Sequence, residues 1–298
     1  MPVNHLATDM TKFVCDTLRR PYPRFAIRHL PRCGNVEATM PDGSVLRLWS
    51  RGEDGIANQV YWRGWSGHEP EALPLFYAFA RHARVVLDIG AHVGLYSLTA
   101  SYANPGARIF AFEPLDAARE RLRMNIRLNR RENIEVLPDA VSDRCGRHPF
   151  YLVTRRLGIP TSSSLSLEFM SRSTPAALTP LQVNVTTIDH FCREHAIAEI
   201  SLAKLDIESL EPQAIEGMRR AIENTKPHLF VEILDGKGTD TALDELAGEF
   251  GYNIFALDAD GPHLQRHIRT DARRHNYLFT SMSASELESL LKASPAAA

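Results

Sequence analysis

The chain contains the run Val85-Val86-Leu87-Asp88-Ile89-Gly90-Ala91-His92-Val93-Gly94, in which apolar residues end at a carboxylate and a glycine-spaced turn follows. Residues 85–89 have the pattern of a buried parallel strand, and residues 95–102 continue at helical spacing. Gly90 and Gly94 therefore lie between a strand and a helix, where glycine permits a positive φ and the close approach of a ligand. The run predicts a nucleotide-binding crevice in an α/β protein.

This turn differs from the loop that binds a dinucleotide. A Gly-x-Gly-x-x-Gly loop holds a pyrophosphate at the helix N-terminus, whereas this turn lacks the middle glycine. Asp88 would also repel the charge of a phosphate. A cationic or zwitterionic ligand fits better, and a nicotinamide-dependent oxidoreductase is disfavoured.

A second apolar strand ends at Glu113, 25 residues after Asp88. This spacing is close to the offset of roughly 20 residues at which an acid reaches a ribose hydroxyl in dinucleotide-binding folds. A third strand at residues 133–137 leads to Asp139 and Ala140. Because ligands of open α/β sheets bind at the carboxyl ends of the strands, we expect these groups to share one site.

Four motifs together resemble those of the FkbM-type S-adenosylmethionine-dependent methyltransferases, in order and approximate spacing. They are Asp88-Ile89-Gly90-Ala91-x-x-Gly94, Phe112-Glu113-Pro114, Thr187-Ile188-Asp189 and Lys204-Leu205-Asp206-Ile207-Glu208-x-x-Glu211. The resemblance covers about residues 69–280. It implies a class I methyltransferase (Rossmann-like) fold, with a seven-strand, mostly parallel sheet behind an N-terminal helix and hairpin. The last strand, residues 277–280, is expected antiparallel beside the fifth.

The resemblance also implies S-adenosylmethionine as the cofactor. In such enzymes the loop after the first strand holds the methionine part, the acid after the second holds the ribose, and the segment after the third lies beside the adenine. The cofactor-binding residues implied here are Glu69, Asp88, Gly90, Ala91, His92, Gly94, Glu113, Asp139, Ala140 and Asp206.

Two positions depart from the family pattern. Ser209 stands where Lys-x-Asp-x-Glu-Gly-x-Glu has its glycine, which raises the question whether the turn there needs a positive φ. His92 replaces an asparagine that is commoner in the first loop.

Acids at the fourth and fifth strand ends are the candidates for catalysis. Asp206 and Glu208 follow the strand at residues 201–205, and Glu232 ends the next strand. A carboxylate whose pKa is raised by neighbouring acids can act as a general base, and His92 is another candidate. The three acids could instead hold Mg²⁺. We favour a site without a metal, because carboxylates on separate strand ends need not converge.

The predicted function is methyl transfer to a hydroxyl of a small molecule, a natural product or a sugar. The alternative is a catalytically inactive binding or scaffold protein that keeps the methyltransferase fold. Intact Asp88, Glu113 and Asp206 favour the enzyme, whereas Ser209 keeps the alternative open.

Composition and charge disfavour nucleic-acid binding, metal sites built on cysteine and membrane insertion. The 298 residues include 34 basic and 36 acidic ones, so a net charge of -2 offers no footprint for nucleic acid. Four widely separated cysteines favour neither a zinc site nor a disulfide framework. The sequence shows no membrane-spanning run and no signal peptide, so we expect a cytoplasmic protein. Its oligomeric state is not indicated.

The chain is expected to have three parts. Residues 1–68 form an N-terminal helix and β-hairpin extension, residues 69–283 form the cofactor-binding domain, and residues 284–298 form a tail. Within the domain, residues 143–185 are too long for an ordinary connection and predict an inserted hairpin. Its serine-rich stretch Thr161–Ser166 is expected to act as a lid that excludes water from the site.

Overall fold

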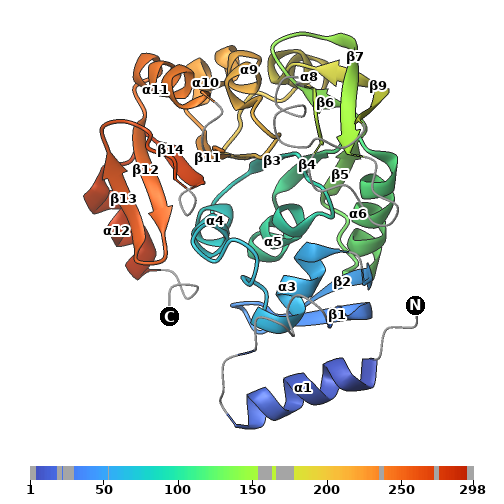
Figure 1. The fold of residues 1–298 in the computed structure, drawn as a ribbon. Helices are drawn as coiled ribbons and strands as arrows, with labels where there is room; N and C mark the ends of the chain where they lie inside the picture. The colour runs from blue at the N-terminus through green and yellow to red at the C-terminus, as the bar shows by residue number, and fades with distance from the viewer. Residues whose placement is uncertain are drawn as a thin grey trace.

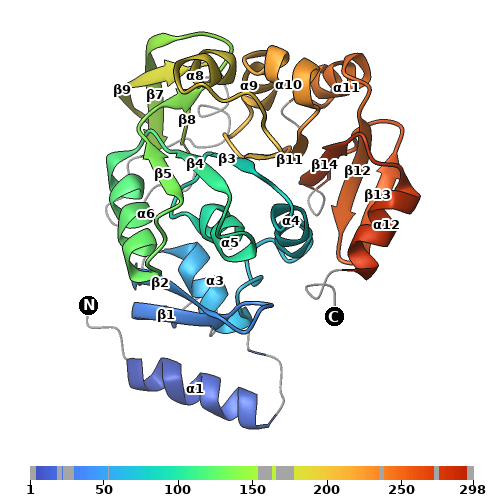
Figure 2. The same cartoon turned by 180° about the vertical axis from the view of Figure 1, so that it is seen from behind.

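The structure, a computed structural model, describes residues 5–18, 22, 30–52, 54–153, 163–165, 178–234, 238–271 and 275–293. A large sheet crosses the molecule with helices on both of its faces, and the first helix lies beneath a separate hairpin (Figures 1 and 2). In this part of the chain, every helix is too short or too polar to cross a membrane.

The large sheet has eight strands in the order β13-β12-β14-β11-β10-β3-β4-β5. Five neighbouring strands, from β11 to β5, pair in parallel. β14 pairs antiparallel with β11, as predicted for the last strand beside the fifth. The strands are β3 (Val85–Ile89), β4 (Arg108–Phe112), β5 (Ile134–Leu137), β10 (Leu202–Leu205), β11 (His228–Glu232), β12 (Asn253–Asp258), β13 (Gly261–Gln265) and β14 (Asn276–Thr280).

The predicted count of seven strands is wrong by one. β13 folds back on the outer edge of β12, and Asp258 pairs with Gly261 across the turn. Gly261 has a φ of 114°, a conformation that glycine adopts without strain. The Asp260-Gly261 pair at this turn is the sequence signal of a hairpin that the prediction missed.

Helices cover the two faces of the sheet as two groups, with α4, α5 and α6 on one side and α8 to α11 on the other (Figure 1). Successive residues of β3 pack into different cores: Val86 faces one, whereas Leu87 and Ile89 face the other. Burial on both faces explains the continuous apolar run. The helices are α1 (His5–Thr17), α3 (Gly55–Arg63), α4 (Leu73–Ala80), α5 (Leu95–Ala103), α6 (Asp116–Leu128), α8 (Ile188–Glu194), α9 (Glu211–Glu216), α10 (Arg219–Thr225), α11 (Asp240–Glu249) and α12 (Ala284–Lys292).

The excursion after β5 contributes to a second sheet of four strands, in the order β6-β9-β7-β8. Its strands are β6 (Ala140–Val141), β7 (Gly146–Val153), β8 (Ser163–Ser164) and β9 (Leu178–Thr186). β7 and β9 pair antiparallel along their length, and β8 adds to the edge of β7. Of the predicted lid Thr161–Ser166, only residues 163–165 belong to the described chain.

The N-terminal hairpin, β1 (Cys33–Thr39) and β2 (Val45–Arg51), is fastened to the main sheet through side chains of α6. Asn125 accepts from the Trp49 amide at 2.8 Å and donates to the Val93 carbonyl at 2.9 Å. Asn129 accepts from the Arg47 amide at 2.8 Å and donates to the Arg47 carbonyl at 2.6 Å. These amides satisfy backbone groups of β2 in place of a third strand.

We expect Asn125→Ala to lower the free energy of unfolding by about 2 to 4 kcal/mol, because it leaves two backbone groups without their partner. Arg127→Ala, on the exposed side of the same helix, is the control and should change stability by less than about 0.5 kcal/mol. Denaturant titration of both variants measures the effect. Equal stability of the two variants would show that the asparagine does not hold the hairpin.

Candidate active site

A cavity of about 420 Å³ opens at the carboxyl ends of the parallel strands. Its walls come from the ends of β3, β4, β10 and β11, from α3 and from the second sheet. Predicted site residues that line it are Glu69, Gly90, His92, Glu113, Asp139, Ala140, Asp206, Glu208 and Glu232. Asp88, Ala91 and Gly94 lie outside its walls.

Asp88 is buried behind the cavity and ties β3 to α5. Its Oδ2 accepts from the Ser97 amide at 2.8 Å and from the Ser97 hydroxyl at 2.5 Å. Burial raises the pKa of Asp88 to about 6, although the bonds from Ser97 oppose this shift. The carboxylate therefore holds the glycine loop in place from behind.

Two glycines let the backbone of this loop approach its neighbours. Gly90 has a φ of 89°, and a Cβ on it would lie 1.9 Å from the carbonyl oxygen of Asp206. Gly94 has a φ of 87°, and a Cβ there would lie 2.2 Å from Leu122 Cδ1. Gly90 thus brings the ends of β3 and β10 together at the cavity, whereas Gly94 allows α5 to pack on α6.

Glu113 presents an oriented carboxylate at the end of β4. Its Oε2 accepts from the His92 amide at 2.9 Å and its Oε1 from the Leu115 amide at 2.8 Å. His92 adopts a φ of 48°, which is a left-handed conformation. Asparagine tolerates this conformation well, which explains why asparagine is the commoner residue at this position in the family. Burial raises the pKa of Glu113 to about 7, with the two amide bonds opposing it. Each oxygen keeps a lone pair for a ligand hydroxyl.

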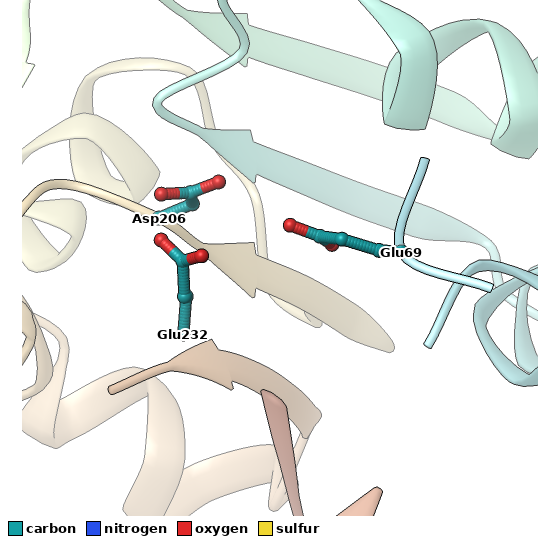
Figure 3. Close-up of side chains that lie close together, drawn as sticks. All are labelled: Glu69, Asp206 and Glu232. Carbon is teal, nitrogen blue, oxygen red and sulfur yellow. The ribbon is translucent and has the colours of Figure 1, made fainter. Parts of the chain in front are cut away.

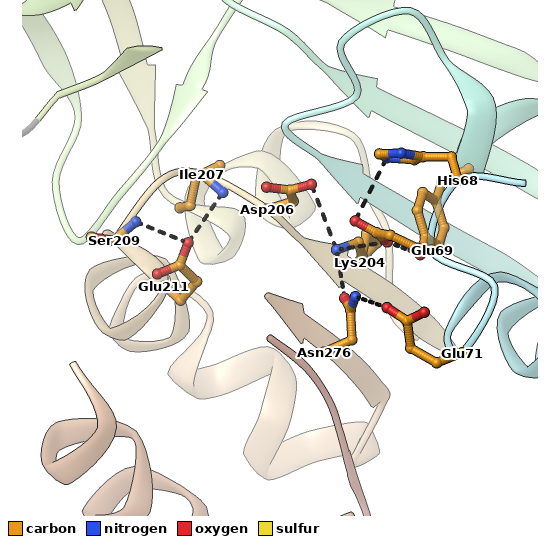
Figure 4. A network of polar contacts seen from close by, with 10 residues as sticks. His68, Glu69, Glu71, Lys204, Asp206, Ile207, Ser209, Glu211 and Asn276 are labelled. Carbon is orange, nitrogen blue, oxygen red and sulfur yellow. Dashed lines mark hydrogen bonds and ion pairs between the residues drawn. The ribbon is translucent and has the colours of Figure 1, made fainter. Parts of the chain in front are cut away.

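A buried ammonium organises the other end of the cavity (Figure 4). Lys204 is fully buried, and its Nζ lies 3.6 Å from Asp206 Oδ2, 3.7 Å from Glu69 Oε2 and 3.5 Å from Asn276 Oδ1. Tyr96 donates its hydroxyl to Glu69 and places its ring 5.1 Å from the ammonium. Burial opposes the charge, but Glu69 and Asp206 outweigh it and hold the pKa of Lys204 above its ordinary value.

Three carboxylates converge in front of this lysine (Figure 3). Oxygens of Glu69, Asp206 and Glu232 all lie within 4.8 Å of one another. Burial, the charge of Asp206 and a hydrogen bond to it raise the pKa of Glu232 well above its ordinary value. Burial also opposes the charge of Asp206, but Lys204 and the bond with Glu232 outweigh it and lower the pKa of Asp206. The pair therefore favours the proton on Glu232 and the charge on Asp206.

The turn after β10 needs left-handed residues. Glu208 has a φ of 58° and Ser209 a φ of 75°, so the position at which the family pattern has glycine does require a positive φ. Glu211 closes the turn, because its Oε1 accepts from the amides of Ile207 and Ser209 at 3.2 Å each. Serine thus maintains this backbone shape with some strain.

Several lining residues were not predicted from the sequence. His68 lies with its Nε2 3.7 Å from Glu69 Oε1, and its position next to Glu69 was the only available signal (Figure 4). Gly55 and Ile56 come from α3, and Phe150 and Leu165 from the second sheet and its edge. No local pattern marks Gly55, Ile56 or Phe150, because they reach the cavity only through tertiary packing. Leu165 lies within the stretch Thr161–Ser166 that was predicted to close over the site.

The excursion touches the turn after β10 directly. Ser164 is buried and donates its hydroxyl to the carbonyl of Glu208 at 2.9 Å. The next residue, Leu165, lines the cavity. The described part of the serine-rich stretch therefore lies against both the strained turn and the site.

A sequence profile described as the methyltransferase FkbM domain matches residues 88–277. The 31-O-demethyl-FK506 methyltransferase FkbM of Streptomyces tacrolimicus is 26% identical over 196 residues, which cover 59% of this chain and 75% of that protein. The 2-O-methyltransferase NoeI of Sinorhizobium fredii is 28% identical over 152 residues, which cover 48% of this chain and 60% of that protein. The profile match confirms the resemblance that the motifs indicated.

A solved structure of methyltransferase FkbM from Methylobacillus flagellatus KT aligns with 66% of this chain at 19% identity and a TM-score of 0.44. The alignment spans 43% of that solved chain.

We expect Ser209→Gly to raise the free energy of unfolding by about 1 kcal/mol, because glycine relieves the left-handed strain. It also removes a buried hydroxyl that finds no partner among the described residues. Ser209→Ala removes the same hydroxyl but keeps the Cβ, so it should gain less. Thermal unfolding of the three proteins measures the difference, and a destabilised Ser209→Gly would contradict the strain.

Proposed function

We propose that this chain, which belongs to the FkbM methyltransferase family, transfers a methyl group from S-adenosylmethionine to a hydroxyl of a small molecule, a natural product or a sugar. One observation carries the proposal: a single cavity has the oriented carboxylate of Glu113 on one wall and the carboxylates held by Lys204 on another. The cavity volume of about 420 Å³ lies within the range of small-molecule sites.

The cavity fits the cofactor through its walls. Glu113 would hold the two ribose hydroxyls with oxygens that the backbone already orients. Asp139 and Ala140 would lie beside the adenine, and the backbone at Gly90 would face the methionine part. S-adenosylmethionine supplies an electrophilic methyl group when bound.

The chain itself aligns the acceptor and takes its proton. Alignment of reacting groups can supply roughly 7 to 11 kcal/mol of barrier lowering. Asp206, which lies beside Lys204 and is hydrogen-bonded to Glu232, is the proposed acceptor of the hydroxyl proton. Because its lowered pKa makes it a weak base, alignment supplies most of the barrier lowering in this proposal. Glu208 and His92 also line the cavity and are the alternative bases.

No metal is needed in this proposal. The sequence left Mg²⁺ open, and Glu69, Asp206 and Glu232 do converge. The ammonium of Lys204, however, lies within 3.7 Å of two of these carboxylates and already neutralises charge at the cluster.

Two relatives support a hydroxyl as the methyl acceptor. One is named as a 31-O-demethyl-FK506 methyltransferase and the other as a 2-O-methyltransferase.

The inactive scaffold is the weaker reading. Ser209 had kept it open, but the turn at residue 209 adopts the positive φ that the family pattern requires. The departure therefore does not break the site.

We expect Glu113→Gln to weaken the binding of S-adenosylhomocysteine at least about tenfold, because charge-assisted bonds to the ribose are lost. The ionised form of Glu113 binds, and its pKa is about 7, so affinity should rise with pH through 7 and level off above about 8. Glu113→Gln should lose this dependence. Titration calorimetry between pH 6 and 8 tests it, and an unchanged affinity would refute the ribose assignment.

Asp206→Asn should lower turnover by roughly 10²- to 10⁴-fold while S-adenosylhomocysteine still binds, because the proton acceptor is lost. Glu232→Gln keeps a hydrogen-bond donor to Asp206 and should lose less. A panel of hydroxyl compounds, screened by mass spectrometry for the added methyl group, supplies the acceptor. Inhibition by EDTA that magnesium reverses would contradict the metal-free mechanism, and near wild-type rates of Asp206→Asn would move the base to Glu208 or His92.

A further inference from the structure

The walls of the cavity carry acidic groups in excess. Six carboxyl groups line it, and among the described residues no lysine or arginine does. The basic side chains in the walls are the imidazoles of His68 and His92. The six acids are Glu69, Glu113, Asp139, Asp206, Glu208 and Glu232.

Protonation leaves most of this charge in place. Burial and the neighbouring Asp206 raise the pKa of Glu232 well above its ordinary value, and burial raises the pKa of Glu113 to about 7. Even if both are neutral, four carboxyl groups remain against the single ammonium of Lys204, so the acids still outnumber this cation. The ammonium of Lys204 is buried and paired with Glu69 and Asp206, so it is not presented to a ligand in the cavity.

This imbalance is local to the cavity. The whole chain has 34 basic and 36 acidic residues, so its surface as a whole favours neither sign of charge. A cavity lined by one sign of charge with low-dielectric walls concentrates the field and enriches ligands of the opposite sign. Among the described residues, an anion that entered would meet more carboxyl groups than cationic side chains.

We propose that the cavity selects hydroxyl acceptors that are neutral or carry an amine, and rejects hydroxyl compounds that carry phosphate, sulfate or carboxylate groups. The assignment of this ligand as the methyl acceptor rests on the proposed function. The charge selection itself rests on the walls of the cavity alone.

A cysteine in place of Gly55 can report the charge of the cavity without replacing any of its acids. It lines the cavity at the start of α3, is exposed, and has a φ outside the left-handed region. A Cβ on it would meet no atom within 4 Å, so a cysteine fits there. Cys145, exposed in the turn between β6 and β7 and outside the cavity walls, is the matched control.

The experiment compares the rates at which two thiol reagents modify these positions. One is the cationic trimethylammonium-ethyl methanethiosulfonate, and the other is the anionic sulfonatoethyl methanethiosulfonate. Gly55→Cys is made with Cys33, Cys145 and Cys192 replaced by serine, and the control keeps Cys145 instead. The cation-to-anion rate ratio cancels any difference in thiol reactivity between the two sites.

We expect the ratio at Gly55→Cys to exceed that at Cys145 by about tenfold or more, and to fall as salt screens the charges. Adding the pair Asp206→Asn and Glu232→Gln, which removes their shared charge, should reduce the ratio. Glu232→Gln alone should reduce it less, because the raised pKa of Glu232 and the lowered pKa of Asp206 leave more of the pair's charge on Asp206. A ratio at Gly55→Cys equal to or below that at Cys145 would overturn the inference, as would failure of both reagents to reach the cysteine.

Calorimetry with S-adenosylhomocysteine on the same protein separates the two proposals. Binding without a cation preference would refute the charge selection and leave the methyltransferase proposal intact. A cation preference without binding would refute the proposed function and leave a cavity that selects cations.

Discussion

The buried ammonium of Lys204 is the interaction on which the site depends. It lies on a central strand with no exposed surface and contacts groups from three separate parts of the chain, Glu69, Asp206 and Asn276. A charge in such a place is stable only with partners, and breaking a buried ion pair costs about 3 to 5 kcal/mol. The lysine therefore fixes how the loop before α4 and the ends of β10 and β14 meet.

The opposite wall is shaped by backbone rather than by charge. Gly90 allows the ends of β3 and β10 to approach, and the left-handed His92 directs its amide to Glu113. Asp88 secures this loop from behind through Ser97. One wall thus presents an acid oriented by amides, and the other presents acids oriented by an ammonium; we assign the first to the nucleoside and the second to the acceptor.

Sequence predicted the parts of the molecule that local pattern controls. Buried parallel strands are recognisable in the sequence as apolar runs. The acids predicted at their carboxyl ends, Glu113, Asp206 and Glu232, all line one cavity in the structure. The sequence could not show that Gly90 lines the cavity whereas Asp88 lies behind its wall, because both residues belong to one motif. His68 and Phe150 reach the cavity by tertiary packing that no local spacing encodes.

The central claim is that this cavity holds S-adenosylmethionine with Glu113 on the ribose and the Lys204 cluster beside the reacting group. The most direct measurement is a crystal structure of the protein with S-adenosylhomocysteine. The account predicts the ribose hydroxyls within hydrogen-bond distance of Glu113 and the sulfur on the side of Asp206. A nucleoside bound outside the cavity, or one whose ribose makes no contact with Glu113, would contradict it.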